Sequence, residues 1–139
     1  MEAAQKKKTT GLTKDAGWQF GVRRTFHRSR QDVWDFLFSE TGLGIWLGRL
    51  DTDLTINEIY RTTEGIEGRI NVLDPYSHIR LTWQPNNREQ ATHLQIRVMG
   101  DKDKAVISFH HDHLESEKER DAVKMYWNEK MKQLAEALL

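Results

Sequence analysis

The chain has 139 residues, of which 37% are hydrophobic, and its 21 basic and 21 acidic residues give a formal net charge of zero. This balance indicates a soluble globular domain and argues against a nucleic-acid binder, because such proteins usually carry a basic excess that neutralises phosphates. No apolar run approaches the roughly 18–20 residues that span a bilayer, and the absence of cysteine excludes disulfides and fits a reducing cytoplasm.

We expect residues 1–16 to form a flexible N-terminal tail and residues 17–139 to form a single domain. The tail has basic residues without an apolar stretch behind them, so we expect no secretory signal there. From Trp18 to Phe26 apolar and polar residues alternate, which predicts a half-buried strand. Arg24 falls on the apolar face of this strand.

Two helices are expected next. Ser29 and Asp32 mark the start of an amphipathic helix that ends near Ser39, because a serine cap and an early acidic residue both suit a helix N-terminus. Residues 41–47 predict a short second helix, which carries Trp46 on its apolar side.

Five extended runs follow, separated by short turn-forming sequences that imply antiparallel neighbours. The runs are residues 55–63, 67–74, 78–85, 91–99 and 104–112. Across the last turn the expected pairs are Val98 with Ile107, Ile96 with Phe109 and Leu94 with His111. Across the turn at Pro75 they are Val72 with Ile79, Ile70 with Leu81 and Gly68 with Trp83. Both registers gather apolar residues on one face of the sheet.

The last element is a long amphipathic helix over Ser116–Leu139. Its apolar stripe contains Val123, Trp127, Met131, Leu134 and Leu138. Ser116 and Glu119 form a capping-box pattern at its start. A helix with one apolar stripe and a sheet with one apolar face predict an α+β domain in which the helix lies across the concave face.

Three stretches resemble the START-like superfamily of helix-grip folds, also called SRPBCC or birch-pollen-allergen-like, and within it the activator of Hsp-90 ATPase homologue family. They are Val22–Phe26 with Ser29–Trp34, Leu43–Gly48 (LGIWLG), and Gly68–Trp83 (GRINVLDPYSHIRLTW). The resemblance covers residues 17–138. It implies a curved antiparallel sheet of about six strands wrapped around the C-terminal helix, with two short helices after the first strand. Two departures are Leu47, where the family has a second tryptophan, and residues 51–57 (DTDLTIN), which replace its usual strand entry.

The resemblance also implies a function. Such domains hold a cavity between sheet and helix that takes a small apolar or amphipathic molecule, such as a lipid or a polyketide. A cyclase or dehydratase acting on such a ligand, and a co-chaperone-like protein that modulates a chaperone ATPase, are the alternatives. We expect ligand binding rather than catalysis, in a cytoplasmic monomer without a cofactor.

The residues expected to line this cavity come from the sheet, from the short second helix and from the long C-terminal helix. They are Trp18, Phe20, Arg24, Trp46, Trp83, Phe109, His111, Tyr126 and Trp127. Any one of the aromatic residues can equally be plain core, because pocket and core look alike in sequence. Arg24 could receive a ligand carboxylate, although pairing with an acidic residue is the favoured interpretation. His111 could contact a ligand, but a ring satisfied by the protein itself is favoured.

The sequence His110-His111-Asp112-His113, with His93 nearby, has donors that suit zinc or iron. The expected register places His111 on the apolar face and puts His93, His110 and Asp112 on the outer face, with His93 opposite Asp112. Because this splits the donors, we expect no metal site but a surface His–Asp pairing. No nucleophile motif or phosphate-binding loop is present, so no catalytic residue is assigned.

Overall fold

A long C-terminal helix packs against one face of an antiparallel sheet in the computed structural model, which describes residues 12–13 and 17–139. The strands are β1 Leu12–Thr13, β2 Gly17–Phe26, β3 Ile59–Arg61, β4 Ile66–Asp74, β5 His78–Pro85, β6 Thr92–Gly100 and β7 Ala105–Leu114. The helices are α2 Arg30–Leu37, α3 Glu40–Trp46 and α4 Glu117–Ala137. Of the expected tail, Leu12–Thr13 pair with β2, and the rest lies outside the described residues.

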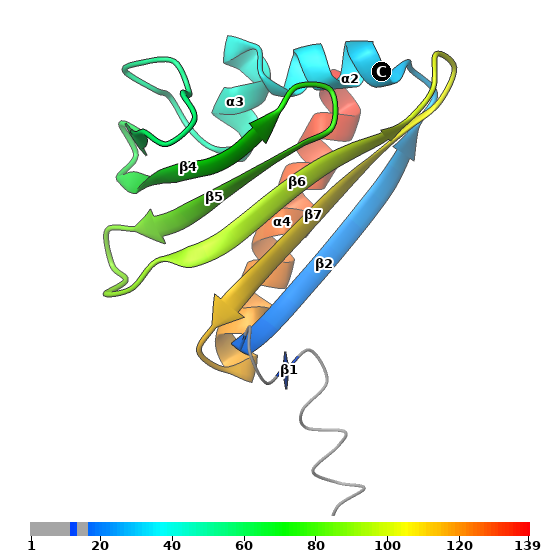
Figure 1. Ribbon diagram of the computed structural model, residues 1–139. Helices are drawn as coiled ribbons and strands as arrows, with labels where there is room; N and C mark the ends of the chain where they lie inside the picture. Colours follow the sequence, from blue (N-terminus) through cyan, green and yellow to red (C-terminus); the bar gives the residue numbers. More distant parts are fainter. Residues whose placement is uncertain (1–11, 14–16) are drawn as a thin grey trace, which may run out of the picture.

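The strand order is β1-β2-β7-β6-β5-β4-β3, and every neighbouring pair is antiparallel. The sheet curves around α4, while α2 and α3 lie together at one end of the strands (Figure 1). This confirms the expected α+β fold, with six principal strands and the two-residue β1 around a long helix. No helix among the described residues is long and apolar enough to span a membrane.

The strand registers agree with the expected ones except near the start of the turn at Pro75. Between β6 and β7, Val98 pairs with Ile107, Ile96 with Phe109 and Leu94 with His111, as predicted. Between β4 and β5, Ile70 pairs with Leu81, as predicted. An irregularity after Ile70 then sets Val72 opposite Arg80 and Leu73 opposite Ile79, so the predicted pairing of Val72 with Ile79 is wrong. One extra residue in β4 shifts the register there.

The predicted strand over residues 55–63 is also too long. Only Ile59–Arg61 pair with β4 in the described structure, with Leu50 and Thr62 forming an isolated bridge beside them. Asn57 adopts a left-handed φ of 68°. Such a conformation interrupts an extended strand, and asparagine tolerates it better than most residues.

Serine caps begin all three helices. The backbone N–H of Asp32 donates to Ser29 Oγ over 3.0 Å, and that of Glu119 donates to Ser116 Oγ over 3.1 Å. Glu119 Oε1 in turn accepts from the backbone N–H of Glu115 at 2.8 Å, one residue before the expected partner. These bonds satisfy N–H groups that have no partner within the helix.

The two glycines of α3 supply a test of the fold. A Cβ on Gly42 would lie 1.9 Å from the Phe36 carbonyl oxygen, whereas a Cβ on Gly44 would meet nothing within 4 Å. We therefore expect Gly44→Ala to raise the free energy of unfolding by about 0.5–1 kcal/mol, because alanine restricts the unfolded chain and favours helix. Gly42→Ala should lower it by about 2 kcal/mol or more. Urea denaturation of both variants checks this, and equal effects at the two positions would contradict the described packing of α3 on α2.

Candidate functional site

A pocket of about 270 Å³ lies between the first half of α4 and the sheet. Trp83 and Thr92, from β5 and β6, line one side, while Val123 and Tyr126 from α4 line the other. Leu114, at the end of β7, adds to the apolar wall. Pockets for small molecules combine mostly apolar walls with a few polar groups, and this one has that character.

An ion pair borders this pocket. Arg88 Nε donates to Glu119 Oε2 and Arg88 Nη2 to Glu119 Oε1, both over 2.8 Å, in a bidentate arrangement. The hydrogen bonds from Arg88 lower the pKa of Glu119, and the same pairing raises the pKa of Arg88. The pair therefore keeps both charges at neutral pH and joins the β5–β6 connection to the start of α4.

Trp83 carries a polar atom without a partner. Its indole Nε1 is buried and makes no hydrogen bond within the described residues. The ring packs against Tyr126 at 5.6 Å between centroids and against His111 at 5.1 Å. An unsatisfied buried donor costs about 1–3 kcal/mol, and Trp83 is also one of the residues that line the pocket.

Behind the pocket, His111 joins the helix to the sheet. Trp127 Nε1–H donates to His111 Nδ1 over 2.8 Å, and His111 Nε2 lies 2.6 Å from Thr92 Oγ1. The Thr92 hydroxyl donates to the Trp83 carbonyl oxygen over 2.8 Å. We call these four groups the His111 chain.

The His111 chain determines the protonation of its histidine. Because Nδ1 accepts from an indole N–H, the ring proton must sit on Nε2, where it donates to the Thr92 hydroxyl. His111 is fully buried, and burial lowers its pKa to about 4. Both ring nitrogens are engaged, so this neutral histidine holds structure together and has no free nitrogen for a ligand.

The nine residues expected to line a cavity separate into three groups. Trp83 and Tyr126 line the pocket. Four residues pack into the core with at most 1% of their surface exposed, namely Trp46, Phe109, His111 and Trp127. Trp18 and Phe20 are half-buried on β2, and Arg24 is exposed there.

Arg24 departs from its expected place inside the fold. It pairs with Ile107, which is fully buried, so both residues start from the same face of the sheet. Within the described residues, β1 pairs with β2 only at Trp18 and Gly17. The side chain of Arg24 is exposed and does not line the pocket.

Sequence reasoning missed Arg88 and Thr92 as site residues. Thr92 alternates with Leu94 and Ile96 on the buried face of β6, and this pattern could have identified a polar residue in the core. Arg88 lies in a turn-forming segment, and its partner Glu119 is 31 residues away. No local pattern predicts a contact of that separation.

A second, larger hollow of about 1180 Å³ lies between α3 and the loop that follows it. Its lining includes Leu43, Leu54 and Leu73 together with charged residues such as Arg49 and Asp53. None of the nine expected cavity residues lines it.

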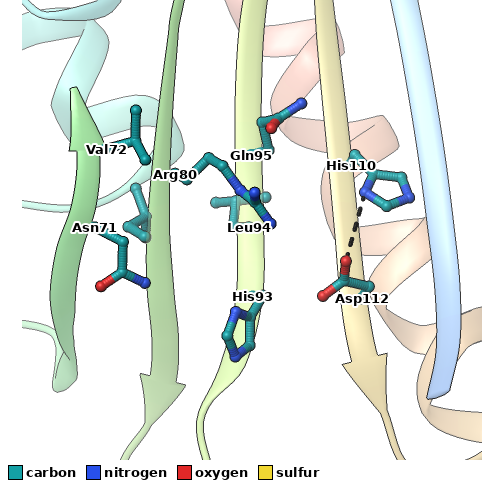
Figure 2. A pocket seen from close by; sticks show the side chains of 9 residues that line it. Asn71, Val72, Arg80, His93, Leu94, Gln95, His110 and Asp112 are labelled. Carbon is teal, nitrogen blue, oxygen red and sulfur yellow. Dashed lines mark ion pairs between the residues drawn. The ribbon is translucent and has the colours of Figure 1, made fainter. Parts of the chain in front are cut away.

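The outer face of the sheet gathers histidines. His93 pairs with Asp112, as expected, and both line a hollow of about 250 Å³ together with His110 and Arg80 (Figure 2). Asp112 pairs with histidine as expected, but its close partner is His113, whose Nδ1 lies 2.6 Å from Asp112 Oδ1, whereas His110 Nδ1 lies 3.8 Å from Asp112 Oδ2. His113 therefore lies with the histidines on the outer face of the sheet. The predicted register did not place His113 there.

A sheet that curves around a long C-terminal helix defines the helix-grip class of folds. The chain belongs to the family described as activator of Hsp90 ATPase homolog 1-like protein, whose model matches residues 27–139. This confirms the resemblance seen in the sequence. No curated protein sequence matches the chain.

Several solved structures share the fold. CalU16 from Micromonospora echinospora matches with a TM-score of 0.74 and 15% identity, over 84% of this chain and 71% of that one. DynU16, a protein in the dynemicin biosynthetic locus, matches with a TM-score of 0.78 and 14% identity, over 86% of this chain but 46% of its own. PFC0360w, an HSP90 activator from Plasmodium falciparum, matches with a TM-score of 0.59 and 12% identity, over 69% and 73%. Identities this low indicate a common fold and nothing more specific.

The lowered pKa of His111 predicts a pH dependence of stability. An unfolded histidine titrates near pH 6.5, whereas His111 in the fold titrates near pH 4. Between these pH values the unfolded state binds more protons than the folded state. The contribution of His111 to the free energy of unfolding is therefore fully present above about pH 6.5 and is lost as the pH drops towards 4. We expect His111 to account for a loss of about 2 kcal/mol between pH 7 and pH 5.

Urea denaturation of the wild type and of His111→Gln at both pH values measures this contribution. Glutamine cannot titrate, so the free energy of unfolding of the His111→Gln protein should fall by about 2 kcal/mol less than that of the wild type between pH 7 and pH 5. Equal losses in the two proteins would show that His111 is not buried in its neutral form.

Proposed function

We propose that this chain binds a small amphipathic molecule in the pocket between α4 and the sheet. The observation that carries the proposal is the Trp83 indole N–H, a buried donor without a partner among the described residues, on a ring that lines a pocket with several apolar walls. A ligand with an apolar body and a carbonyl, ether or hydroxyl oxygen would fill the space and accept from this donor.

The size of the pocket limits the ligand. Its volume of about 270 Å³ is slightly below the roughly 300–1,000 Å³ typical of sites for drug-sized molecules. Trp127 and Phe109 pack ring against ring at 5.1 Å beneath α4, which leaves the ligand at the edge of the helix–sheet interface rather than deep within it. One or two fused rings, or one segment of a longer polyketide or fatty chain, suit this space.

The comparisons support ligand binding at the level of the fold. DynU16, whose fold this chain shares, is a protein in the dynemicin biosynthetic locus. The catalytic alternative has less support, since His111 has both ring nitrogens engaged and Arg24 is exposed on β2. In an enzyme acting on such a ligand, His111 would be the acid–base candidate and Arg24 the anchor, but neither residue lines the pocket.

The family description favours a second candidate, a co-chaperone that stimulates an Hsp90 ATPase. PFC0360w, which is an HSP90 activator, shares the fold. Such an activity would use an outer surface of the domain and would not need the pocket. Stimulation of an Hsp90 ATPase that persists when the pocket is filled would favour this candidate over ligand binding.

Filling the pocket from α4 tests ligand binding. Ala122 lines the pocket yet is exposed, so Ala122→Phe should block the space without disturbing the core. We expect the wild type to show thermal stabilisation and a change in tryptophan fluorescence with at least one member of a panel of fatty acids, aromatic polyketides and flavonoids. Ala122→Phe should weaken that binding at least about tenfold, because a buried ring occupies the site.

Ala137→Phe is the matched control, because it makes the same change at an exposed α4 residue outside the pocket lining. It should bind as the wild type does. The proposed site would be refuted if no compound in the panel stabilised the wild type or changed its fluorescence. It would also be refuted if the Ala122→Phe protein bound a compound as tightly as the wild type does.

A further inference from the structure

The outer face of β7 carries an irregularity that changes which way its side chains point. Trp18 of β2 pairs with Leu114, but Phe20 pairs with His111, so β7 has one residue more than β2 in this interval. His113 adopts a left-handed φ of 63°. In a regular strand Asp112 and His113 would point to opposite faces. The bulge leaves both on the outer side and returns Leu114 to the buried face.

This places three donor groups together. One ligand atom from each of His93, Asp112 and His113 lies within 4.8 Å of those of the other two. The rings of His93 and His113 stack with centroids 4.1 Å apart, which aligns them on the same side of the sheet. Asp112 is largely buried beneath them, with 13% of its side chain exposed, while His113 remains 45% exposed.

We propose that His93, Asp112 and His113 form a binding site for a divalent transition-metal ion, for which Zn²⁺ is the appropriate probe. Two imidazoles and one carboxylate are donors that zinc accepts, and three protein ligands leave one position for water. The adjoining hollow of about 250 Å³ has room for that water.

The distances between the three donor atoms are close to those of a tetrahedral zinc site but do not match them. Zinc–ligand bonds of roughly 2.0–2.2 Å place tetrahedral donors about 3.4 Å apart. Donors that lie as far as 4.8 Å apart must therefore move closer, whereas His113 Nδ1 and Asp112 Oδ1, at 2.6 Å, must separate slightly. Rotation of the exposed His113 side chain can supply that movement. The bond from His113 Nδ1 to Asp112 Oδ1 already holds two of the three side chains beside one another.

Neighbouring charges set the expected strength of the site. Arg80 lines the same hollow and opposes a cation, whereas the carboxylate of Asp112 attracts it. His110 lies 3.8 Å from Asp112 through its Nδ1, and its Nε2 is bonded to Gln19 Oε1 at 2.7 Å. We therefore assign it no ligand role and expect micromolar affinity.

Calorimetric titration of the tag-free, chelator-treated protein with ZnCl₂ tests the site. We expect one ion per chain, and at a hundredfold excess over Kd a rise in melting temperature of about 5 °C or more. His93→Gln and His113→Asn should each weaken binding at least about tenfold. Asparagine tolerates a left-handed φ, so the second variant removes the imidazole while keeping the bulge. Circular dichroism and thermal unfolding without metal verify that both variants fold.

His27→Gln is the control, because it removes an exposed histidine that is not part of the cluster. It should bind zinc as the wild type does. Absence of saturable binding to the wild type would overturn the proposal. So would unchanged affinity in folded His93→Gln and His113→Asn proteins, or an equal loss in His27→Gln.

Discussion

The hydrogen-bond chain through His111 is the interaction on which the arrangement of helix and sheet depends. It runs from Trp127 on α4 through His111 on β7 and Thr92 on β6 to the backbone carbonyl of Trp83 on β5. The side chains of Trp127, His111 and Thr92 are fully buried. Each polar group in this dry environment needs its partner, since an unpaired buried donor or acceptor is costly. Sliding α4 along the sheet would separate Trp127 from His111, so the chain specifies one position of the helix.

The same chain explains where the pocket lies. Trp127 packs edge-on against Phe109 and Tyr126, at 5.1 Å and 4.8 Å between centroids, and so fills the space under the middle of α4. Towards the start of α4 a pocket remains beside Trp83. The backbone carbonyl of Trp83 accepts from Thr92, whereas its buried indole N–H has no partner among the described residues.

Local patterns in the sequence were sufficient for most of the fold. The alternation in β2 and β5–β7, the capping serines Ser29 and Ser116, and the apolar stripe of α4 all reflect interactions between residues close in sequence or across short turns. The β6–β7 register followed for the same reason. The strand over residues 55–63 was predicted too long, because a turn at Asn57 interrupts it.

The candidate sites were less predictable, because they depend on distant contacts and on single-residue insertions. The partners of His111 lie 16 and 19 residues away, and Arg88 meets Glu119 across 31 residues. The bulge in β7 brings His113 to the same face as Asp112, which strict alternation forbids. Arg24 pairs with the buried Ile107 and yet is exposed, which alternation along β2 does not predict.

His111 fixes α4 on the sheet only as a neutral, fully bonded member of the core, and nitrogen NMR of the imidazole measures this state directly. In ¹⁵N-labelled protein at pH 7, the His111 signals should show a protonated Nε2 and an unprotonated Nδ1, with a hydrogen-bond coupling from the Trp127 indole N–H to Nδ1. This pattern should persist to well below pH 6, because burial lowers the pKa of His111 to about 4. A charged ring at neutral pH, the opposite tautomer, or rapid exchange between the two would contradict the account.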